Sequence, residues 1–365
     1  MNTYAMSRSR KTPFSETSAC LAPGDSANHL DHLAAVADVM EVPIVTEEEK
    51  VVDLLERYYP QACPLFIPHR SRTLEFLAAR YNLLFVTSTN YRRDLSPFLQ
   101  LLFQKEMRFC YCPHGHSDKP VTQFREQDLS LIYGDHMESQ LREENLLSYL
   151  RGYVRTGNYR LTFYQKYAQW FNELIEEEVF SDFDKQQLTW LYAPTWQDAE
   201  CSSSLLELGL SLIEQLPDHY NLVIKLHPWS SAQEPGFVTM IQERYRNKKN
   251  LKILDLFPPV LPLLSRVDIY LGDFSSVGYD FLYFNRPMFF FDPSLRLRRE
   301  RKGSNLLHSC GILIPPHAYS HLYDFASYRL KEQKSLHPRR SSLYQKTFGR
   351  ERTYQEIRQN LSLHL

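Results

Sequence analysis

The chain has 365 residues, of which 43% are hydrophobic and 23% charged, a composition typical of a soluble globular protein. This length exceeds what most single hydrophobic cores reach, so two domains are expected. The 42 Lys and Arg residues against 43 Asp and Glu residues argue against a nucleic-acid-binding protein that depends on phosphate contacts. No apolar run approaches the roughly 20 residues that a membrane-spanning helix needs.

The N-terminal region and the cysteines indicate the compartment in which the protein works. Ser, Thr and Pro dominate residues 1–30, which lack the apolar core of a secretory signal, so a flexible N-terminal tail is expected there. The six cysteines are widely scattered and form no disulfide framework. A reducing cytoplasm is the location that these features predict.

Apolar strand patterns alternate with helical patterns from about residue 30 to residue 180. In chain order, the patterns predict helices over 32–42 and 51–59, a strand over 83–90, a helix over 98–104, a strand over 107–112, a strand, turn and helix over 129–144, and a strand that becomes a long helix over 153–180.

A second alternation begins at residue 189 and ends near residue 293. It predicts strands over 189–196, 221–229, 251–256, 268–274 and 287–293, with helices over 204–216, 237–247, 260–267 and 276–284. Continuous apolar strands separated by helices are typical of parallel sheets covered on both faces. The sequence therefore predicts an α/β protein with two doubly wound domains, over 31–180 and 181–345, joined at the polar stretch 181–187.

The first distinctive strand end is CYCPHGHSDK, because ligands of open parallel sheets bind beyond the carboxyl ends of the strands. His114 follows this strand beside Gly115, where an imidazole can face a cleft and act as a general base. A surface histidine in a turn is the plainer interpretation of the same residue. A zinc site of Cys110, Cys112, His114 and His116 is disfavoured, since four ligands within a short extended stretch cannot easily surround one ion.

Three further strand ends belong to the second domain. Thr195 ends the first of these strands, and Lys225 and His227 point to one side at the end of another. Ser275 and Ser276 begin the helix after the strand 268–274, where backbone N–H groups and the helix dipole favour an anion. Each serine alone is equally compatible with an ordinary N-cap. The convergence of three such strand ends in one domain favours a phosphate pocket.

Several common nucleotide and hydrolase signatures are missing from the sequence. It contains no GxxxxGK[ST] loop, no GxGxxG after a strand and no GxSxG elbow. The one DxD-like element, Asp182–Asp184, lies between the two domains, where helix capping explains it. We therefore expect neither a catalytic metal ion nor a cofactor.

The motifs HGHSDK, LYAPTW, KLHP and GDFSSVGYD, in this order, resemble the CDP-glycerol glycerophosphotransferase family of teichoic-acid synthesis. The family's patterns are HGTPLK, a YAPTWR-like strand end, K-x-HP and DYSSV-x-x-D. The stretch RTGNYR, residues 155–160, is similar to the segment that closes the first domain in this family. This sequence departs from the family at residues 116–118, and Gln197 stands where arginine is usual, which leaves donor and acceptor open.

The resemblance implies a GT-B architecture, with two Rossmann-like domains facing each other across a cleft and a C-terminal helix, here over 346–365, that crosses back. It implies a metal-independent transferase that moves glycerol phosphate, or a related group, from a CDP-activated donor to an acceptor hydroxyl. The site residues that it implies are His114 as the base, His227 as a second catalytic residue, donor contacts at Thr195, Lys225, Ser275, Ser276 and Asp280 (the last on the ribose), and His116 and Lys119 on the acceptor side.

Two other functions stay open at this stage, together with the membrane question. One is a GT-B glycosyltransferase that uses a UDP-, GDP- or CMP-sugar, and the other is a catalytically degenerate nucleotide-binding module; both would use the same residues. A sugar-nucleotide epimerase of this fold would need further acidic residues, which cannot be placed in this sequence. Members of the family work on lipid-linked acceptors at the cytoplasmic face of the membrane. The basic run over 296–302 is therefore either a solvated loop or a contact with anionic lipid on the inner face of the cell membrane.

Overall fold

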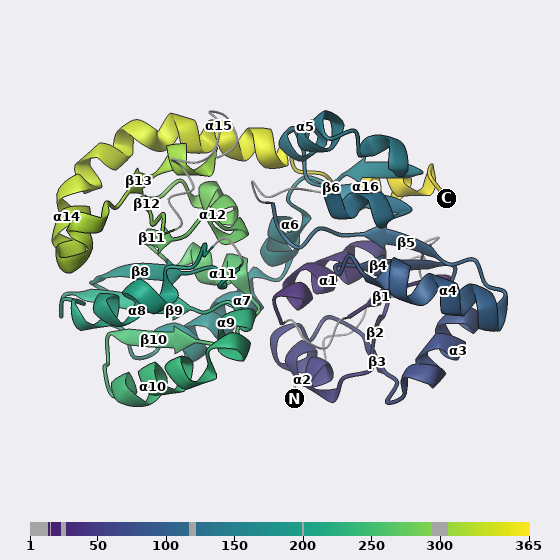
Figure 1. Cartoon of the computed structure of the whole chain (residues 1–365), viewed down its shortest axis with the longest axis horizontal. Coiled ribbons are helices and arrows are strands. Elements are labelled where there is room, and N and C mark those ends of the chain that lie inside the picture. The colour runs from purple at the N-terminus through teal and green to yellow at the C-terminus, as the bar shows by residue number, and fades with distance from the viewer. Residues whose placement is uncertain (1–13, 15, 23–26, 117–121, 199–200, 294–305) are drawn as a thin grey trace.

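A computed structural model describes residues 14, 16–22, 27–116, 122–198, 201–293 and 306–365. Two parallel sheets lie side by side, each flanked by helices (Figure 1). The seven-stranded sheet has the order β3-β2-β1-β4-β5-β6-β7, and the six-stranded sheet has the order β10-β9-β8-β11-β12-β13. In both sheets the order reverses beside the first strand of the sheet, which is the arrangement of doubly wound folds.

The first half of the chain builds the seven-stranded sheet. Its strands are β1 (Ser18–Leu21), β2 (Ile44–Thr46), β3 (Pro64–Phe66), β4 (Leu83–Val86), β5 (Arg108–Tyr111), β6 (Leu129–Ile132) and β7 (Gly152–Arg155). Its helices are α1 (Ala27–Met40), α2 (Glu49–Tyr58), α3 (Arg70–Arg80), α4 (Tyr91–Phe103), α5 (Asp135–Glu143), α6 (Tyr159–Lys166) and α7 (Ala168–Ile175).

The second half builds the six-stranded sheet and then returns to the first. The strands are β8 (Leu188–Ala193), β9 (Tyr220–Lys225), β10 (Leu251–Leu254), β11 (Ile269–Gly272), β12 (Met288–Phe290) and β13 (Ile312–Leu313). The helices are α8 (Leu205–Glu214), α9 (Pro228–Gln233), α10 (Pro235–Tyr245), α11 (Val260–Ser265), α12 (Ser276–Phe281), α14 (Leu322–Arg329), α15 (His337–Phe348) and α16 (Tyr354–Ser362). Within the described ranges, none of these helices combines the length and hydrophobicity that crossing a bilayer requires.

The prediction of a flexible tail over residues 1–30 is wrong for residues 18–21, because they form the buried strand β1. Cys20 pairs with Ile44 on one side and with Phe85 on the other, so this strand lies inside the sheet. The segment reads SACL, with two small residues and no β-branched or aromatic side chain, and therefore carries little strand signal of its own. Its sheet neighbours, rather than its composition, make it a strand.

The stretch 153–180 is also more interrupted than a single long helix. After β7 it forms α6, then α7, and ends in a turn of π-helix over Glu176–Phe180. The residues between Leu21 and Leu83 likewise contain two short strands, β2 and β3, that the apolar pattern does not mark.

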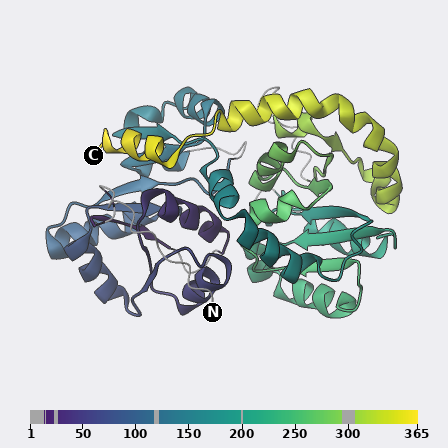
Figure 2. The ribbon, with the colours of Figure 1, turned by 180° about the vertical axis from the view of Figure 1, so that it is seen from behind.

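The C-terminal segment crosses back to the first sheet, as Figures 1 and 2 show from opposite sides. It is not one helix over 346–365: α15 ends at Phe348, Gly349 follows with φ +68°, and α16 begins after Thr353. Thr353 and Glu356 form a reciprocal capping box at the start of α16. α15 packs on α5, and α16 packs on α1 and β7, so the last helix covers the first domain.

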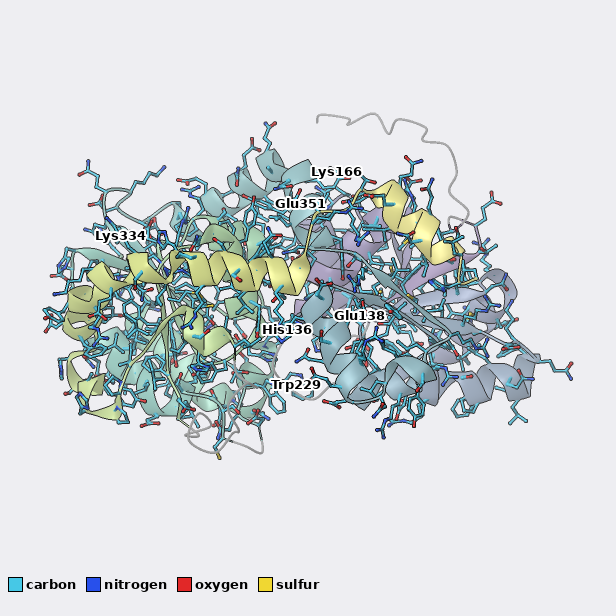
Figure 3. The ribbon with its side chains drawn as sticks, turned by 90° about the horizontal axis from the view of Figure 1, so that it is seen from above. His136, Glu138, Lys166, Trp229, Lys334 and Glu351 are labelled. Atoms are coloured by element: carbon cyan, nitrogen blue, oxygen red, sulfur yellow. The ribbon has the colours of Figure 1, made fainter. Side chains whose placement is uncertain are left out.

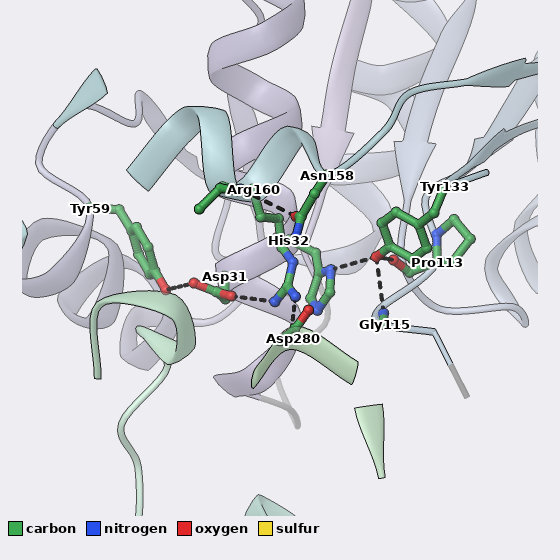
Figure 4. A network of polar contacts seen from close by, with 10 residues as sticks. Asp31, His32, Tyr59, Pro113, Gly115, Tyr133, Asn158, Arg160 and Asp280 are labelled. Carbon is green, nitrogen blue, oxygen red and sulfur yellow. Dashed lines mark hydrogen bonds and ion pairs between the residues drawn. The ribbon is translucent and has the colours of Figure 1, made fainter. Parts of the chain in front are cut away.

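A buried guanidinium joins the two halves of the molecule (Figure 4). Arg160 of α6 donates to Asp31 Oδ2 at 2.7 Å and also forms an ion pair with Asp280 of α12. All three side chains are at most 8% exposed, and the Tyr59 hydroxyl donates to the other oxygen of Asp31 at 3.0 Å. Burial of so many charges is tolerated because each is paired.

Replacing Arg160 with Met is expected to lower the free energy of unfolding by about 3–5 kcal/mol, because it leaves two buried carboxylates without their cation. Urea unfolding followed by circular dichroism measures the change. The matched control is Arg244→Met, which removes the 54% exposed partner of Glu214 and is expected to cost less than about 1 kcal/mol. Equal losses in the two variants contradict the role given to Arg160.

Candidate active site

A cavity of about 350 Å³ lies between the two sheets, at the carboxyl ends of their strands. Most of its polar wall comes from the residues that follow β5, β8, β9 and β11. The sequence-predicted residues that it brings together are His114, Thr195, Lys225, His227, Ser275, Ser276 and Asp280. His32, Arg160 and Trp196 also line it.

His114 stands after β5 with its ring accessible from the cavity. Its Nδ1 lies 3.1 Å from the carbonyl oxygen of Thr87, which can only accept, so Nδ1 carries the proton and Nε2 keeps its lone pair. The surrounding protein disfavours the charged imidazolium and lowers the pKa of His114, although the bond to Thr87 partly opposes this. A neutral imidazole with an available acceptor nitrogen has the properties of a general base.

Two histidines of α1 surround His114, and no sequence motif pointed to them. The ring of His29 stacks on that of His114, with centroids 4.5 Å apart and planes 19° apart. His32 meets the same ring edge-on at 6.5 Å. His32 Nδ1 also lies 3.4 Å from the Tyr133 hydroxyl, which donates to the carbonyl of Pro113 at 2.8 Å and so fixes the turn before His114 (Figure 4).

Lys225 ends β9, and His227 follows it, on the opposite wall. His227 is the N-cap of α9, and its Nδ1 accepts the backbone N–H of Trp229 at 3.2 Å, so the proton of the neutral ring is on Nε2. The tautomer of His227 is therefore opposite to that of His114. Lys225 is only 7% exposed, and burial lowers the pKa of its ammonium to about 8, against the opposing effects of Asp31 and Asp255.

The turn before α12 contains a buried carboxyl group, Asp273, which bonds it to neighbouring backbone. Asp273 Oδ2 accepts the backbone N–H groups of Thr195 at 2.9 Å and Ser204 at 3.1 Å, which ties the end of β8 to the end of β11. Burial raises the pKa of Asp273 to about 7, although these hydrogen bonds act in the opposite direction. Ser275 occupies the N-cap position of α12, yet its side chain makes no capping hydrogen bond. The hydroxyl is thus not explained by helix capping.

Asp280 lies on the cavity wall but is only 3% exposed, and its Oδ2 is bound to Arg160. Its observed contact is thus with the first domain. The predicted ribose contact stays a prediction and can involve only what this ion pair leaves of the carboxylate.

His116 is buried and does not line the cavity, and the acceptor-side role predicted for it stays a prediction. Its Nε2 is 2.9 Å from Nδ1 of His136, and its ring meets Tyr279 of α12 edge-on at 4.6 Å (His136 is labelled in Figure 3). Lys119 and the basic run over 296–302 lie outside the described residues. No group of three or more His, Cys, Asp or Glu side chains in the described part of the chain could hold a metal ion.

The two walls of the cavity touch at Gly115. A Cβ atom built on this glycine lies 2.5 Å from Ser276 Cβ and 2.8 Å from Ser276 Oγ, and the residue has φ +113°. Both the close approach and the backbone conformation require glycine. The turn that carries His114 and the turn that carries the two serines are therefore in direct contact.

Comparisons with solved structures identify the class of fold. The wall teichoic acid polymerase TagF matches over 96% of this chain and 88% of its own, with a TM-score of 0.65 and 14% identity. A complex of Anabaena Alr3699/HepE with UDP and glucose matches over 95% and 98%, with a TM-score of 0.56 and 9% identity. The fold is that of the two-domain GT-B proteins, as the sequence predicted.

The sequence comparisons find similarity to one family over part of the chain. A family model described as CDP-glycerol:poly(glycerophosphate) glycerophosphotransferase matches residues 148–307. The teichoic acid glycerol-phosphate primase of Bacillus subtilis (strain 168) is 32% identical over 114 residues, which cover 31% of this chain and 28% of the primase. The chain thus resembles the CDP-glycerol glycerophosphotransferase family over part of its length, residues 148–307. Its matched segment spans less than a third of the length of this curated relative.

Gly115→Ala is expected to lower the free energy of unfolding by about 1–3 kcal/mol, because it adds backbone strain and an overlap with Ser276. The second substitution Ser276→Gly removes the overlapping Cβ and should restore part of the loss, which a double-mutant cycle measures. The matched control is Gly236→Ala, whose added Cβ meets nothing within 4 Å and which should change stability little. A Gly115→Ala variant as stable as the parent contradicts the contact.

Proposed function

We propose that the protein is a transferase that moves glycerol phosphate from a CDP-activated donor to an acceptor hydroxyl, with His114 as the base. The observation that carries this proposal is that His114 and the anion-binding candidates Lys225, His227, Ser275 and Ser276 line one cavity from opposite domains. The family match over residues 148–307 supports the choice of CDP-glycerol as the donor.

In this proposal the donor diphosphate lies against Ser275, Ser276, Lys225 and His227. The hydroxyls of Ser275 and Ser276, the backbone N–H groups at the start of α12 and the Nε2–H of His227 donate to its oxygens, and the Lys225 ammonium supplies a full positive charge. These groups stabilise the charge that grows on the leaving CMP, which is the task of a metal ion in many other nucleotide-dependent transferases. The proposed reaction thus uses protein groups in place of a metal.

The base acts from the other domain. His114 Nε2 accepts the proton of the acceptor hydroxyl while that oxygen forms a bond to the β-phosphorus of the donor. The bond from this phosphorus to the bridging oxygen breaks, and CMP leaves with the electron pair. The Nδ1–H bond to Thr87 favours the imidazolium that results.

A sugar nucleotide is the alternative donor, because the same residues could serve attack at an anomeric carbon. Its support is the structural neighbour of the same fold that was solved with UDP and glucose. A lipid-linked acceptor and a position at the inner membrane surface belong to the proposal as well. Their support is the curated relative, which is named a teichoic acid primase.

The test separates binding from chemistry. CMP release from CDP-glycerol, with a short synthetic poly(glycerol phosphate) as acceptor, should fall by about 10²–10⁴-fold in His114→Gln. Isothermal titration should show CDP affinity retained in that variant and lost in Ser275→Ala/Ser276→Ala. The acid limb of kcat/KM in the parent should lie below pH 6.5, because the surrounding protein disfavours the imidazolium and lowers the pKa of His114.

Parent-like turnover in His114→Gln removes the base assignment, and unchanged CDP affinity in the double serine variant removes the diphosphate site. Tighter binding of UDP or GDP than of CDP, together with turnover of a sugar nucleotide only, favours the alternative donor.

The affinity for CDP should fall as the pH rises above about 8. Lys225 has a pKa of about 8 in the free protein, so above this pH the ammonium is increasingly neutral and binding must first protonate it. Linkage gives a loss that approaches tenfold per pH unit while the bound ammonium stays charged. Titrations at pH 7, 8 and 9 measure this loss, and Lys225→Met should bind CDP weakly with little pH dependence over the same range. A parent whose affinity does not change across this range contradicts the role of Lys225.

A further inference from the structure

The ring of His114 is held by two residues that lie outside every motif of the sequence. His29 of α1 covers one face of the ring at a centroid distance of 4.5 Å, nearly parallel to it. Thr87, which follows β4, contacts both imidazoles: its carbonyl oxygen lies 3.1 Å from His114 Nδ1, and its hydroxyl lies 2.9 Å from His29 Nδ1. Thr87 is fully buried, so packed side chains surround the point from which both rings are held.

We propose that His29 and Thr87 are positioning residues for the base, an inference that rests on the proposed function. Thr87 fixes the tautomer of His114 through its carbonyl and fixes the ring of His29 through its hydroxyl. His29 in turn fixes the plane of His114 by stacking. Together they aim the Nε2 lone pair of His114 at the place where the acceptor hydroxyl must lie.

Without these contacts the imidazole of His114 can adopt other ring orientations of similar energy. The χ2 torsion of histidine is broad and nearly two-fold, so a half-turn exchanges the position of Nδ1 with that of a carbon atom. Such a turn breaks the bond to Thr87 and leaves its buried carbonyl without that donor. A stacked ring on one face opposes the intermediate orientations, since they overlap with His29.

The stack also requires that His29 itself stays uncharged. Burial lowers the pKa of His29, and the nearby imidazoles of His114 and His227 lower it further. His32, beside Arg160, is shifted in the same direction for the same principal reason, burial. When His114 takes a proton in the reaction, the ring that covers it is therefore neutral and can accommodate the new charge.

The experiment uses three variants of the full chain and two measurements. His29→Ala removes the stacking ring, His29→Phe keeps a ring but removes the bond to Thr87, and Thr87→Val removes the hydroxyl but keeps the carbonyl. Nitrogen-15 shifts of the histidine rings, recorded without substrate, report the tautomer of His114 directly. CMP release from CDP-glycerol reports kcat.

His29→Ala is expected to lower kcat by about 10–100-fold, the loss that small misplacements of a catalytic group produce, with KM for CDP-glycerol nearly unchanged. Without the stack, the ring of His114 turns more freely about χ2 and the bond to Thr87 is partly lost, so His114 should show a mixture of the two neutral tautomers in place of Nδ1–H alone. His29→Phe should restore most of kcat and the single tautomer, because the stack is kept. Thr87→Val should fall between them, since only the hold on His29 is weakened.

The matched control is His219→Ala, which removes another histidine that packs on an aromatic ring, Tyr220, with centroids 4.3 Å apart and planes tilted by 54°. His219 does not line the cavity. It should leave kcat and the tautomer of His114 as in the parent.

A His29→Ala variant with parent kcat and an unmixed tautomer overturns the inference. So does a His29→Phe variant that loses as much activity as His29→Ala while both remain folded. If His29→Ala does not fold, the same two measurements on His29→Phe and Thr87→Val test the inference. It then requires kcat and the tautomer to be close to those of the parent in His29→Phe and to be changed in Thr87→Val. The tautomer is measured without substrate, so it tests the positioning even if CDP-glycerol proves not to be the donor.

Discussion

The buried guanidinium of Arg160 is the constraint on which the geometry of the cleft depends. It binds one carboxylate from α1 of the first domain and one from α12 of the second, and all three groups are almost completely shielded from water. A pair of carboxylates in such surroundings is stable only with a cation between them. Because α1 also carries His29 and His32, and α12 begins at Ser276, the same ion pairs set the distance between the two walls of the cavity.

The two histidines of the site differ in the hydrogen bond that each makes with the backbone. A carbonyl oxygen holds the proton of His114 on Nδ1, whereas a backbone N–H keeps the Nδ1 of His227 deprotonated. One ring can therefore accept a proton from substrate, and the other can donate a hydrogen bond to it. The neighbouring backbone thus gives two chemically identical side chains opposite functions.

Much of the fold could be predicted from the sequence, because strands that are buried on both faces have continuous apolar sequences. The first strand could not, since Ser18–Leu21 contains small residues and owes its burial to the neighbouring strands on both sides. The strand-end motifs likewise indicated the cavity residues of both domains. His29, His32 and Thr87 gave no signal, because they reach the site from a helix face and a bend that only the three-dimensional arrangement brings close to His114. His116 was adjacent in sequence to the site but turns to His136, a direction that spacing alone does not reveal.

The return of the C-terminal segment has a consequence for the order in which the protein acquires its structure. Gly152 of β7 packs against the side chain of His364, the carbonyl of Leu365 accepts from Arg108, and α16 lies on α1. The first sheet thus receives this cover only after residues 354–365 have been synthesised. Until then its edge strand and the apolar side of α1 lack their cover, and contacts between residues over 200 positions apart in sequence must close last. The cover of the first domain therefore depends on late, long-range contacts with the C-terminal segment.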